Sequence, residues 1–283
     1  MTIDEGPTLR RRRLGAELKK FREQAGLTQE AVSRHFEWNT AKLTRIETAR
    51  VAVTARDVRD LLSLYGVQEE KYREALVELA RLSKERSWWT DYKDVMRPGN
   101  FVGLEAGATA MRVFEPTIVP GLLQTESYIR ALMRSGGRPT ETQAQLDRRV
   151  SLRLTRQSRL TGTNRLELTA LIDESVLHRT IGGEGVRRAQ LQHLIDTGQS
   201  PNVTIQILPM SFGEHLFLGG PAALLEFRET THLDVVYLEG LAGDLYEEQP
   251  TEVARYREEF DRLGAAALDH RMSLKMIESL LQA

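Results

Sequence analysis

Apolar residues in the first third of the chain recur three and four positions apart, the spacing that places side chains on one helix face. Leu14, Leu18 and Phe21 mark a first amphipathic helix, which Gly26 ends. Residues suited to N-cap positions precede three later segments, at Thr28, Asn39 and Thr54. The pattern therefore predicts five helices, over residues 10–25, 29–36, 40–48, 55–65 and 68–86.

From residue 102 onward the hydrophobic pattern mixes two periods. Short apolar and β-branched runs predict four strands, at residues 166–172, 203–208, 222–227 and 233–238. Longer stretches with helical spacing predict helices at residues 103–114, 122–134, 140–160, 184–197, 251–268 and 273–281. We therefore expect an α+β fold, with a five-helix N-terminal part followed by a mixed α/β part.

A change of character between the two patterns predicts the domain boundary. Residues 87–101 hold Trp88, Trp89 and a Pro-Gly break at residues 98 and 99. Adjacent tryptophans more often pack a domain junction than bind a ligand. We expect a DNA-binding domain over residues 9–86, a junction over 87–101 and a second domain over 102–283.

The composition excludes several classes of protein and of metal site. The chain has 283 residues and no cysteine, which excludes disulfides and thiolate metal sites and fits the cytoplasm. No apolar run is long enough for a membrane span, and the acidic first residues predict no secretory signal. Residues 1–86 carry 18 Lys and Arg against 14 Asp and Glu, whereas the rest carries 21 against 26. This asymmetry favours a polyanion bound at the N-terminal end.

The segment from Thr28 to Arg50 has the features that a helix-turn-helix requires. Ser33 supplies a small residue where the helices cross, and apolar residues face the first helix and the core at helical spacing: Val32, Phe36, Leu43 and Ile46. Polar residues open the second helix, the end that enters a major groove. Two expected glycines are missing, at Glu37 in the turn and Ala49 after the second helix. Either these residues adopt a left-handed conformation, at a cost on the order of 1 kcal/mol, or the backbone avoids positive φ.

The segment resembles the Xre-type, phage-repressor-like helix-turn-helix regulators. The resemblance rests on Arg22, Leu27, Thr28, Gln29, Ser33, Leu43, Ile46 and Glu47. It implies that Gln29 contacts a phosphate and braces the recognition helix, and that Arg22 pairs with Glu47. A partly buried pair of this kind fixes geometry more than it adds stability.

The same resemblance implies the residues that contact double-stranded DNA. Base contacts would come from Thr40, Ala41 and Arg45, with Asn39 on the same exposed side. The Arg45 guanidinium can bond guanine bidentately, which is worth about 1–3 kcal/mol of discrimination. We expect phosphate contacts from Lys42 and Arg50. An arginine arm that precedes or opens the first helix would neutralise phosphates or enter a minor groove, through Arg10, Arg11, Arg12 and Arg13.

Residues 88–283 resemble the C-terminal domain that follows this helix-turn-helix in many actinobacterial regulators. The matching stretches include residues 115–128, 148–157, 172–177, 190–194 and 201–209. Some members are described as antitoxin-like, which implies control by a small acidic protein partner. Arg149, Arg153 and Arg156 share one face of a predicted helix. They would bind that partner or an anionic ligand, or pair with acids of their own domain.

Catalysis is the weakest interpretation of the second domain. Glu174 and His178 are spaced to bind a metal on a helix, but no third ligand is near in sequence. We expect no enzyme activity, no catalytic residues, no cofactor and no metal. The leading hypothesis is a homodimeric, sequence-specific regulator at the nucleoid, with no membrane partner. The alternatives are an interaction protein that sequesters a small acidic partner, and a regulator that senses a small molecule between the sheet and the 122–134 helix.

Overall fold

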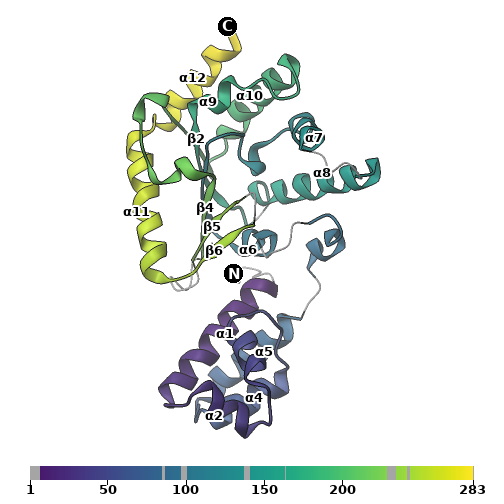
Figure 1. Ribbon diagram of the computed structural model, residues 1–283, viewed down its shortest axis with the longest axis vertical. Coiled ribbons are helices and arrows are strands. Elements are labelled where there is room, and N and C mark those ends of the chain that lie inside the picture. Colours follow the sequence, from purple (N-terminus) through teal and green to yellow (C-terminus); the bar gives the residue numbers. More distant parts are fainter. Residues whose placement is uncertain are drawn as a thin grey trace. The chain divides into compact units, whose positions relative to one another are not determined.

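The structure is a computed structural model that describes residues 7–84, 87–96, 101–136, 141–162, 164–227, 234–240 and 243–282. The chain divides into two compact units, Met1–Thr90 and Asp91–Ala283 (Figure 1). The first unit is helical and the second is built on a mixed sheet. This arrangement confirms the predicted α+β fold class. Among the described residues, no helix has both the length and the apolar character that crossing a membrane requires.

The N-terminal unit contains five α-helices, as predicted from the apolar spacing. They are α1 (Pro7–Gln24), α2 (Gln29–His35), α3 (Thr40–Glu47), α4 (Ala55–Leu64) and α5 (Glu70–Leu82). The three predicted caps accept hydrogen bonds from backbone amides, with Thr28 bonded to Ala31 N at 3.1 Å and Asn39 to Ala41 N at 2.9 Å. The core between the helices is aliphatic, and its fully buried members include Leu18, Val32, Leu43, Val58 and Leu61.

Both positions that lack the expected glycine adopt the left-handed conformation. Glu37 has φ of 56° and Ala49 has φ of 57°. After α2, Glu37 N donates to Arg34 O and Trp38 N donates to Ser33 O at 2.8 Å. After α3, Ala49 N donates to Ile46 O at 3.0 Å and Arg50 N donates to Arg45 O at 2.8 Å. These paired bonds are the Schellman ending of a helix, in which glycine is the common residue.

Trp38 closes the end of α2 after the left-handed residue. Its ring stacks on Phe36 with the ring centroids 4.9 Å apart. The stacked pair covers the apolar end of α2 beside the left-handed residue. The positive φ at Glu37 confirms the first alternative for this turn, and the alternative that the backbone avoids positive φ is wrong.

The C-terminal unit is organised around a six-stranded sheet with the order β3-β2-β1-β4-β5-β6. The pairs β1–β2 and β2–β3 are parallel, and the other three pairs are antiparallel. The strands are β1 (Ala110–Glu115), β2 (Glu167–Asp173), β3 (Val203–Leu208), β4 (Ala222–Glu226), β5 (Val235–Leu238) and β6 (Leu245–Glu247). The connections hold α6 (Phe101–Gly107), α7 (Glu126–Ser135), α8 (Gln143–Gln157), α9 (Glu174–His178), α10 (Glu184–Gly198), α11 (Pro250–Ala266) and α12 (His270–Gln282).

The prediction of a helix over residues 103–114 was wrong. The helix α6 ends at Gly107, and the chain continues as β1, a central strand between β2 and β4. Small residues around Gly107 made the segment look helical, whereas Met111, Val113 and Glu115 alternate with Arg112 and Phe114 as a strand requires. The strand β6 was also missed, because three residues with half-exposed side chains give little hydrophobic pattern.

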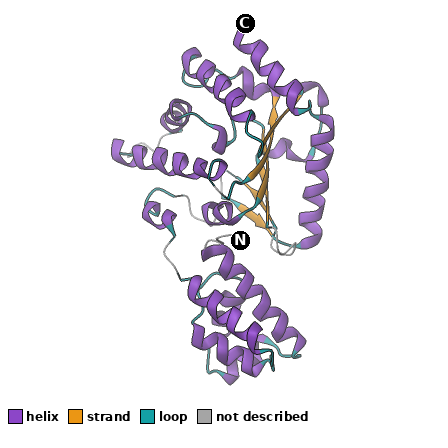
Figure 2. Cartoon of the chain, turned by 180° about the vertical axis from the view of Figure 1, so that it is seen from behind, coloured by secondary structure: helices purple, strands orange, loops and turns teal. Residues whose placement is uncertain are grey.

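Helices cover both faces of the sheet (Figure 2). On one face α11 packs across β3, β4 and β5, and Phe114, Leu224 and Val236 meet Phe260 and Leu263 in a buried cluster. Strand alternation turns Met111, Val113 and Glu115 to the opposite face, where α7 and α8 lie (Figure 1). The two faces therefore differ, since the α11 face is a closed apolar core and the other face borders a pocket.

Glycine at either left-handed position should stabilise the N-terminal unit. We expect Glu37→Gly and Ala49→Gly each to raise the free energy of unfolding by about 1 kcal/mol, because glycine adopts positive φ without a Cβ clash. Chemical denaturation of the full chain measures the change. Ala31→Gly, in the exposed middle of α2, is the matched control and should destabilise by about 1 kcal/mol. If Glu37→Gly or Ala49→Gly destabilised the chain as much as Ala31→Gly does, the backbone at that position would not be strained.

Candidate nucleic-acid interface and a sheet-face pocket

A buried hydrogen-bond network joins the first three helices. Arg22 Nε donates to Glu47 Oε1 at 2.7 Å and Arg22 Nη2 donates to Glu47 Oε2 at 3.1 Å. Gln29 Nε2 donates to Glu47 Oε2 at 2.7 Å, and Gln29 Oε1 accepts from Thr44 Oγ1 at 2.9 Å. The hydrogen bond to Glu47 raises the pKa of Arg22. The network fixes α3 against α1 and α2 through side chains from all three helices.

A second contact holds the C-terminal end of α3 against α1. A Cβ on Gly15 of α1 would lie 2.7 Å from the backbone carbonyl oxygens of Ile46 and Glu47. The two helix backbones therefore touch where no side chain fits. Ser33, the small residue predicted at the helix crossing, is buried, and its hydroxyl has no hydrogen-bond partner within the described part of the chain.

The residues predicted to contact bases lie on the exposed side of α3, Thr40 and Ala41 in its first turn and Arg45 one turn later. Asn39, Thr40, Ala41 and Arg45 are exposed. Among the residues that the structure describes, Arg45 donates only from Nε to Ala41 O of its own helix, at 3.2 Å, so its guanidinium is available to an external acceptor. Thr40 and Ala41 offer a small hydroxyl and a methyl group beside it. The arrangement suits a helix whose first turn enters a groove.

The predicted phosphate contacts differ in their surroundings. Lys42 Nζ lies 3.5 Å from the centroid of the Trp38 ring and 3.5 Å from Asp57 Oδ2. Arg50 is exposed. Trp38 and Asp57 therefore hold the Lys42 charge near the turn, with part of its side chain still exposed.

The four consecutive arginines lie within α1 and do not form an extended arm before it. Arg10 and Arg12 each keep only 8% of their surface exposed. Arg11 Nε donates to Ser83 O at 3.1 Å, and burial lowers the pKa of Arg11. Arg13 is half-buried. The helical conformation and this burial weaken the interpretation of residues 10–13 as a flexible minor-groove arm.

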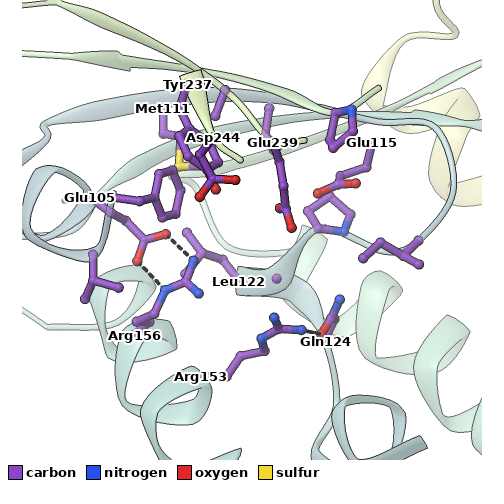
Figure 3. Close-up of a pocket in the computed structure, with 18 of the residues that line it drawn as sticks. Glu105, Met111, Glu115, Leu122, Gln124, Arg153, Arg156, Tyr237, Glu239 and Asp244 are labelled. Atoms are coloured by element: carbon purple, nitrogen blue, oxygen red, sulfur yellow. Dashed lines mark hydrogen bonds and ion pairs between the residues drawn. The ribbon is translucent and has the colours of Figure 1, made fainter. Parts of the chain in front are cut away.

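A polar pocket of about 210 Å³ lies between the sheet and α8 (Figure 3). Carboxylates and an aromatic hydroxyl approach it from the strand side, at Glu115, Glu239, Asp244 and Tyr237, and guanidinium groups approach from α8. Helix α7 contributes Met133 to the wall. The pocket therefore adjoins the region predicted for a small molecule, but α8 lines it more than the 122–134 segment does.

The three arginines predicted to bind a partner all line this pocket, in different ways. Arg156 donates to both oxygens of the buried Glu105 at 2.7 Å, and Arg149 donates to Glu141 at 2.8 Å. Arg153 instead donates to the neutral Gln124, with Nη1 2.8 Å from Oε1. The alternative that these arginines pair with acids of their own domain thus describes Arg149 and Arg156. It does not describe Arg153.

Burial shifts the pKa values of Glu115 and Arg153, which have no direct ionic partner in the pocket among the described residues. Burial, and the neighbouring carboxylate of Glu239, raise the pKa of Glu115 to about 8. Burial lowers the pKa of Arg153 to about 10. Shifts of this kind, in a concave site with several polar groups, are typical of binding sites.

Comparison with known families assigns both parts of the chain. Residues 13–76 match the model described as a helix-turn-helix domain. Residues 99–279 match the model described as a domain of unknown function, DUF5753, and this match covers more than half of the chain. The chain belongs to the DUF5753 family. No curated protein and no solved structure matches the chain. The helix-turn-helix match supports a DNA-binding regulator, and most residues that line the pocket described above lie within the DUF5753 match.

Sequence reasoning missed most polar residues of the DUF5753 pocket. Glu115 and Gln124 stood in stretches that carried the family resemblance, but nothing local distinguished them from helix caps and loop residues. Recognising residues 110–115 as a strand would have placed Glu115 at the carboxyl end of a central strand, where ligands of open α/β sheets commonly bind. Glu105 and Glu239 reach the pocket only through long-range packing.

The ion pair between Arg22 and Glu47 should contribute strongly to the stability of the helix-turn-helix. Glu47→Gln removes the charge opposite Arg22, whose side chain is 9% exposed, and we expect a loss of about 3 kcal/mol in denaturant unfolding. Glu78→Gln breaks the exposed pair with Arg81 and should change stability by less than about 1 kcal/mol. Replacing both partners, as Arg22→Met with Glu47→Leu, should recover part of the loss. If Glu47→Gln and Glu78→Gln lowered the free energy of unfolding equally, burial of the ion pair would not explain its contribution to stability.

The raised pKa of Glu115 should make the DUF5753 domain less stable as pH rises. Between about 4.5 and about 8 the folded state keeps a proton that the unfolded chain has lost. Folding stability therefore falls through this window, by up to about 1.4 kcal/mol per pH unit. Thermal unfolding of wild type and Glu115→Gln at matched pH values isolates the effect, because the variant lacks it. Parallel pH profiles of the two proteins would show that Glu115 titrates normally.

Proposed function

We propose that the chain is a sequence-specific transcriptional regulator that reads DNA with the exposed side of α3. The proposal is supported by one observation above all, the exposed group Asn39, Thr40, Ala41 and Arg45 on a helix held by the Arg22–Glu47–Gln29 network. A rigid support is what precise base recognition requires. The Xre-type resemblance assigns three of these residues, Thr40, Ala41 and Arg45, to base contacts. The role we propose is not enzymatic, and its place is the cytoplasm, on the nucleoid.

We propose that the regulator binds its operator as a homodimer. A single helix of eight residues reaches few base pairs. Two copies related by a twofold axis would read half-sites one helical turn apart, roughly 34 Å. The energy of discrimination then doubles without any new type of contact. The DUF5753 domain is the part of the chain left to provide the dimer surface.

Control of DNA binding through the DUF5753 domain is the second part of the proposal. The resemblance to antitoxin-like regulators favours a small acidic protein as partner. The internal pairing of Arg149 and Arg156 supports that idea less, because an acidic partner needs exposed cations. The pocket favours the second candidate, a regulator that responds to a small molecule. Co-purification of a small acidic protein with the full chain would restore the first.

The base-reading residue is tested by substitution against a library of operator variants. Arg45→Ala should lose about 1–3 kcal/mol of discrimination at one base pair of each half-site, because the bidentate contact to guanine is removed. In a twofold dimer the relaxed positions should occur as a symmetric pair about one helical turn apart. Lys42→Ala should instead weaken all sequences alike and reduce the dependence of affinity on salt.

Arg81→Ala is the matched control for Arg45→Ala. It removes the same charge from an exposed position on α5, and its discrimination between bases should equal that of wild type. An equal loss on specific and random DNA for Arg45→Ala would overturn the assignment of Arg45. A single relaxed position, with no symmetric counterpart, would overturn the homodimer while leaving base reading by α3 intact.

A further inference from the structure

The pocket on the sheet face holds two kinds of charged group. Glu105 and Arg156 form a bidentate pair, and Arg149 is bonded to Glu141. These pairs neutralise themselves within the domain. Glu115 and Arg153 are different, since they line the same cavity and no hydrogen bond joins them among the described residues.

Glu115 presents a buried carboxylate to the cavity. It follows Phe114 at the end of β1, and strand alternation turns it away from the α11 core. Only 9% of its surface is exposed, and its carboxylate makes no hydrogen bond within the described ranges. The carboxylate of Glu239 points into the same space from the strand side (Figure 3). A buried carboxylate without hydrogen-bond donors is costly, so this side of the pocket suits a ligand that donates hydrogen bonds.

Arg153 presents the complementary group from α8. Arg153 Nη1 donates to Gln124 Oε1 at 2.8 Å, and Gln124 is itself held because its Nε2 donates to Val119 O at 2.6 Å. One neutral acceptor satisfies one of the five donors of a guanidinium. In Figure 3, Arg153 extends toward the cavity from below while the carboxylates enter from above. This side of the pocket suits an anionic acceptor.

Apolar side chains separate the two polar sides. Phe101, Met111, Leu122 and Leu152 line the cavity, and the Phe101 and Tyr237 rings have centroids 4.3 Å apart. Such walls bury an aliphatic or aromatic body. The volume of about 210 Å³ accommodates a molecule with the dimensions of a large amino acid and is too small for a folded partner.

We propose that this pocket binds a small zwitterion with an apolar body, its ammonium group at Glu115 and Glu239 and its carboxylate at Arg153 and Gln124. A ligand with an ammonium group alone would leave the Arg153 guanidinium short of acceptors. A ligand with a carboxylate alone would bring a further negative charge toward Glu239 and would offer no hydrogen-bond donor to Glu115. A free amino acid with an aromatic or aliphatic side chain has the required chemistry. This inference names the class of small molecule for the ligand-responsive regulator proposed above. Binding of the ligand does not depend on that proposed function, and only the effect of the ligand on DNA binding rests on it.

Three probes with the same aromatic body test the charge requirement by titration calorimetry on the full chain. Phenylalanine carries both charges, phenethylamine only the ammonium and hydrocinnamate only the carboxylate. We expect phenylalanine to bind at least about tenfold more tightly than either of the others, a difference of about 1.4 kcal/mol. Equal affinity for phenylalanine and a singly charged probe would overturn the proposal, and so would the absence of binding by all three.

Two substitutions then assign each charge to its residue. Glu115→Gln should remove the advantage of phenylalanine over hydrocinnamate, and Arg153→Gln should remove its advantage over phenethylamine. Arg148→Gln is the control, because Arg148 pairs with Asp94 and does not line the cavity. Affinity unchanged in both pocket variants would overturn the assignment. If a variant does not fold, the preference of the wild-type chain among the probes still decides the proposal.

Measuring DNA binding separately distinguishes the two proposals. Phenylalanine that binds without changing operator affinity would leave the site established and the regulatory role refuted. Normal operator binding by a chain that binds none of the probes would refute the site and leave the DNA-binding proposal standing.

Discussion

The contact between Arg22 and Glu47 is the interaction on which the DNA-reading part of the structure depends. A guanidinium and a carboxylate removed from water are stable only when they face each other with good geometry. Here the pair also fixes Gln29, and Gln29 fixes Thr44. The first turn of α3 can therefore consist of small, exposed residues, because the buried Arg22–Glu47 pair and Gln29 set its orientation from the other side of the helix.

The two units show opposite uses of buried charge. In the N-terminal unit the charges are matched, and each acceptor of Glu47 has a donor. In the C-terminal unit Arg156 and Glu105 are matched as well, but Glu115 and Arg153 remain on opposite sides of a cavity. The matched pairs fix how helices pack, whereas Glu115 and Arg153 give the two sides of the cavity opposite polar character.

Sequence patterns predicted the helices of the first unit because each helix carries its own signals, an apolar face and a cap. They failed at β1, where small residues around Gly107 imitate a helix and the strand is identified only by its neighbours on both sides. The backbone at Glu37 and Ala49 also could not be predicted, since both residues tolerate either conformation and the Schellman bonds decide. The pocket was beyond local reasoning, because Glu105, Glu115 and Glu239 come together only in the folded sheet. The Arg22–Glu47 pair was reached through a family resemblance, not through its spacing.

The close approach at Gly15 limits how this protein can be regulated. Because the α1 backbone touches the last carbonyls of α3, no side chain between them can change rotamer to let α3 move. Rearrangement of the reading helix inside its own unit is therefore excluded as a low-energy response. In the proposed dimer, an inducing signal would therefore act on whole N-terminal units as rigid bodies, by altering the distance or angle between two of them on an operator. Such a signal would change the spacing that the proposed dimer reads and leave the bases recognised by each half unchanged.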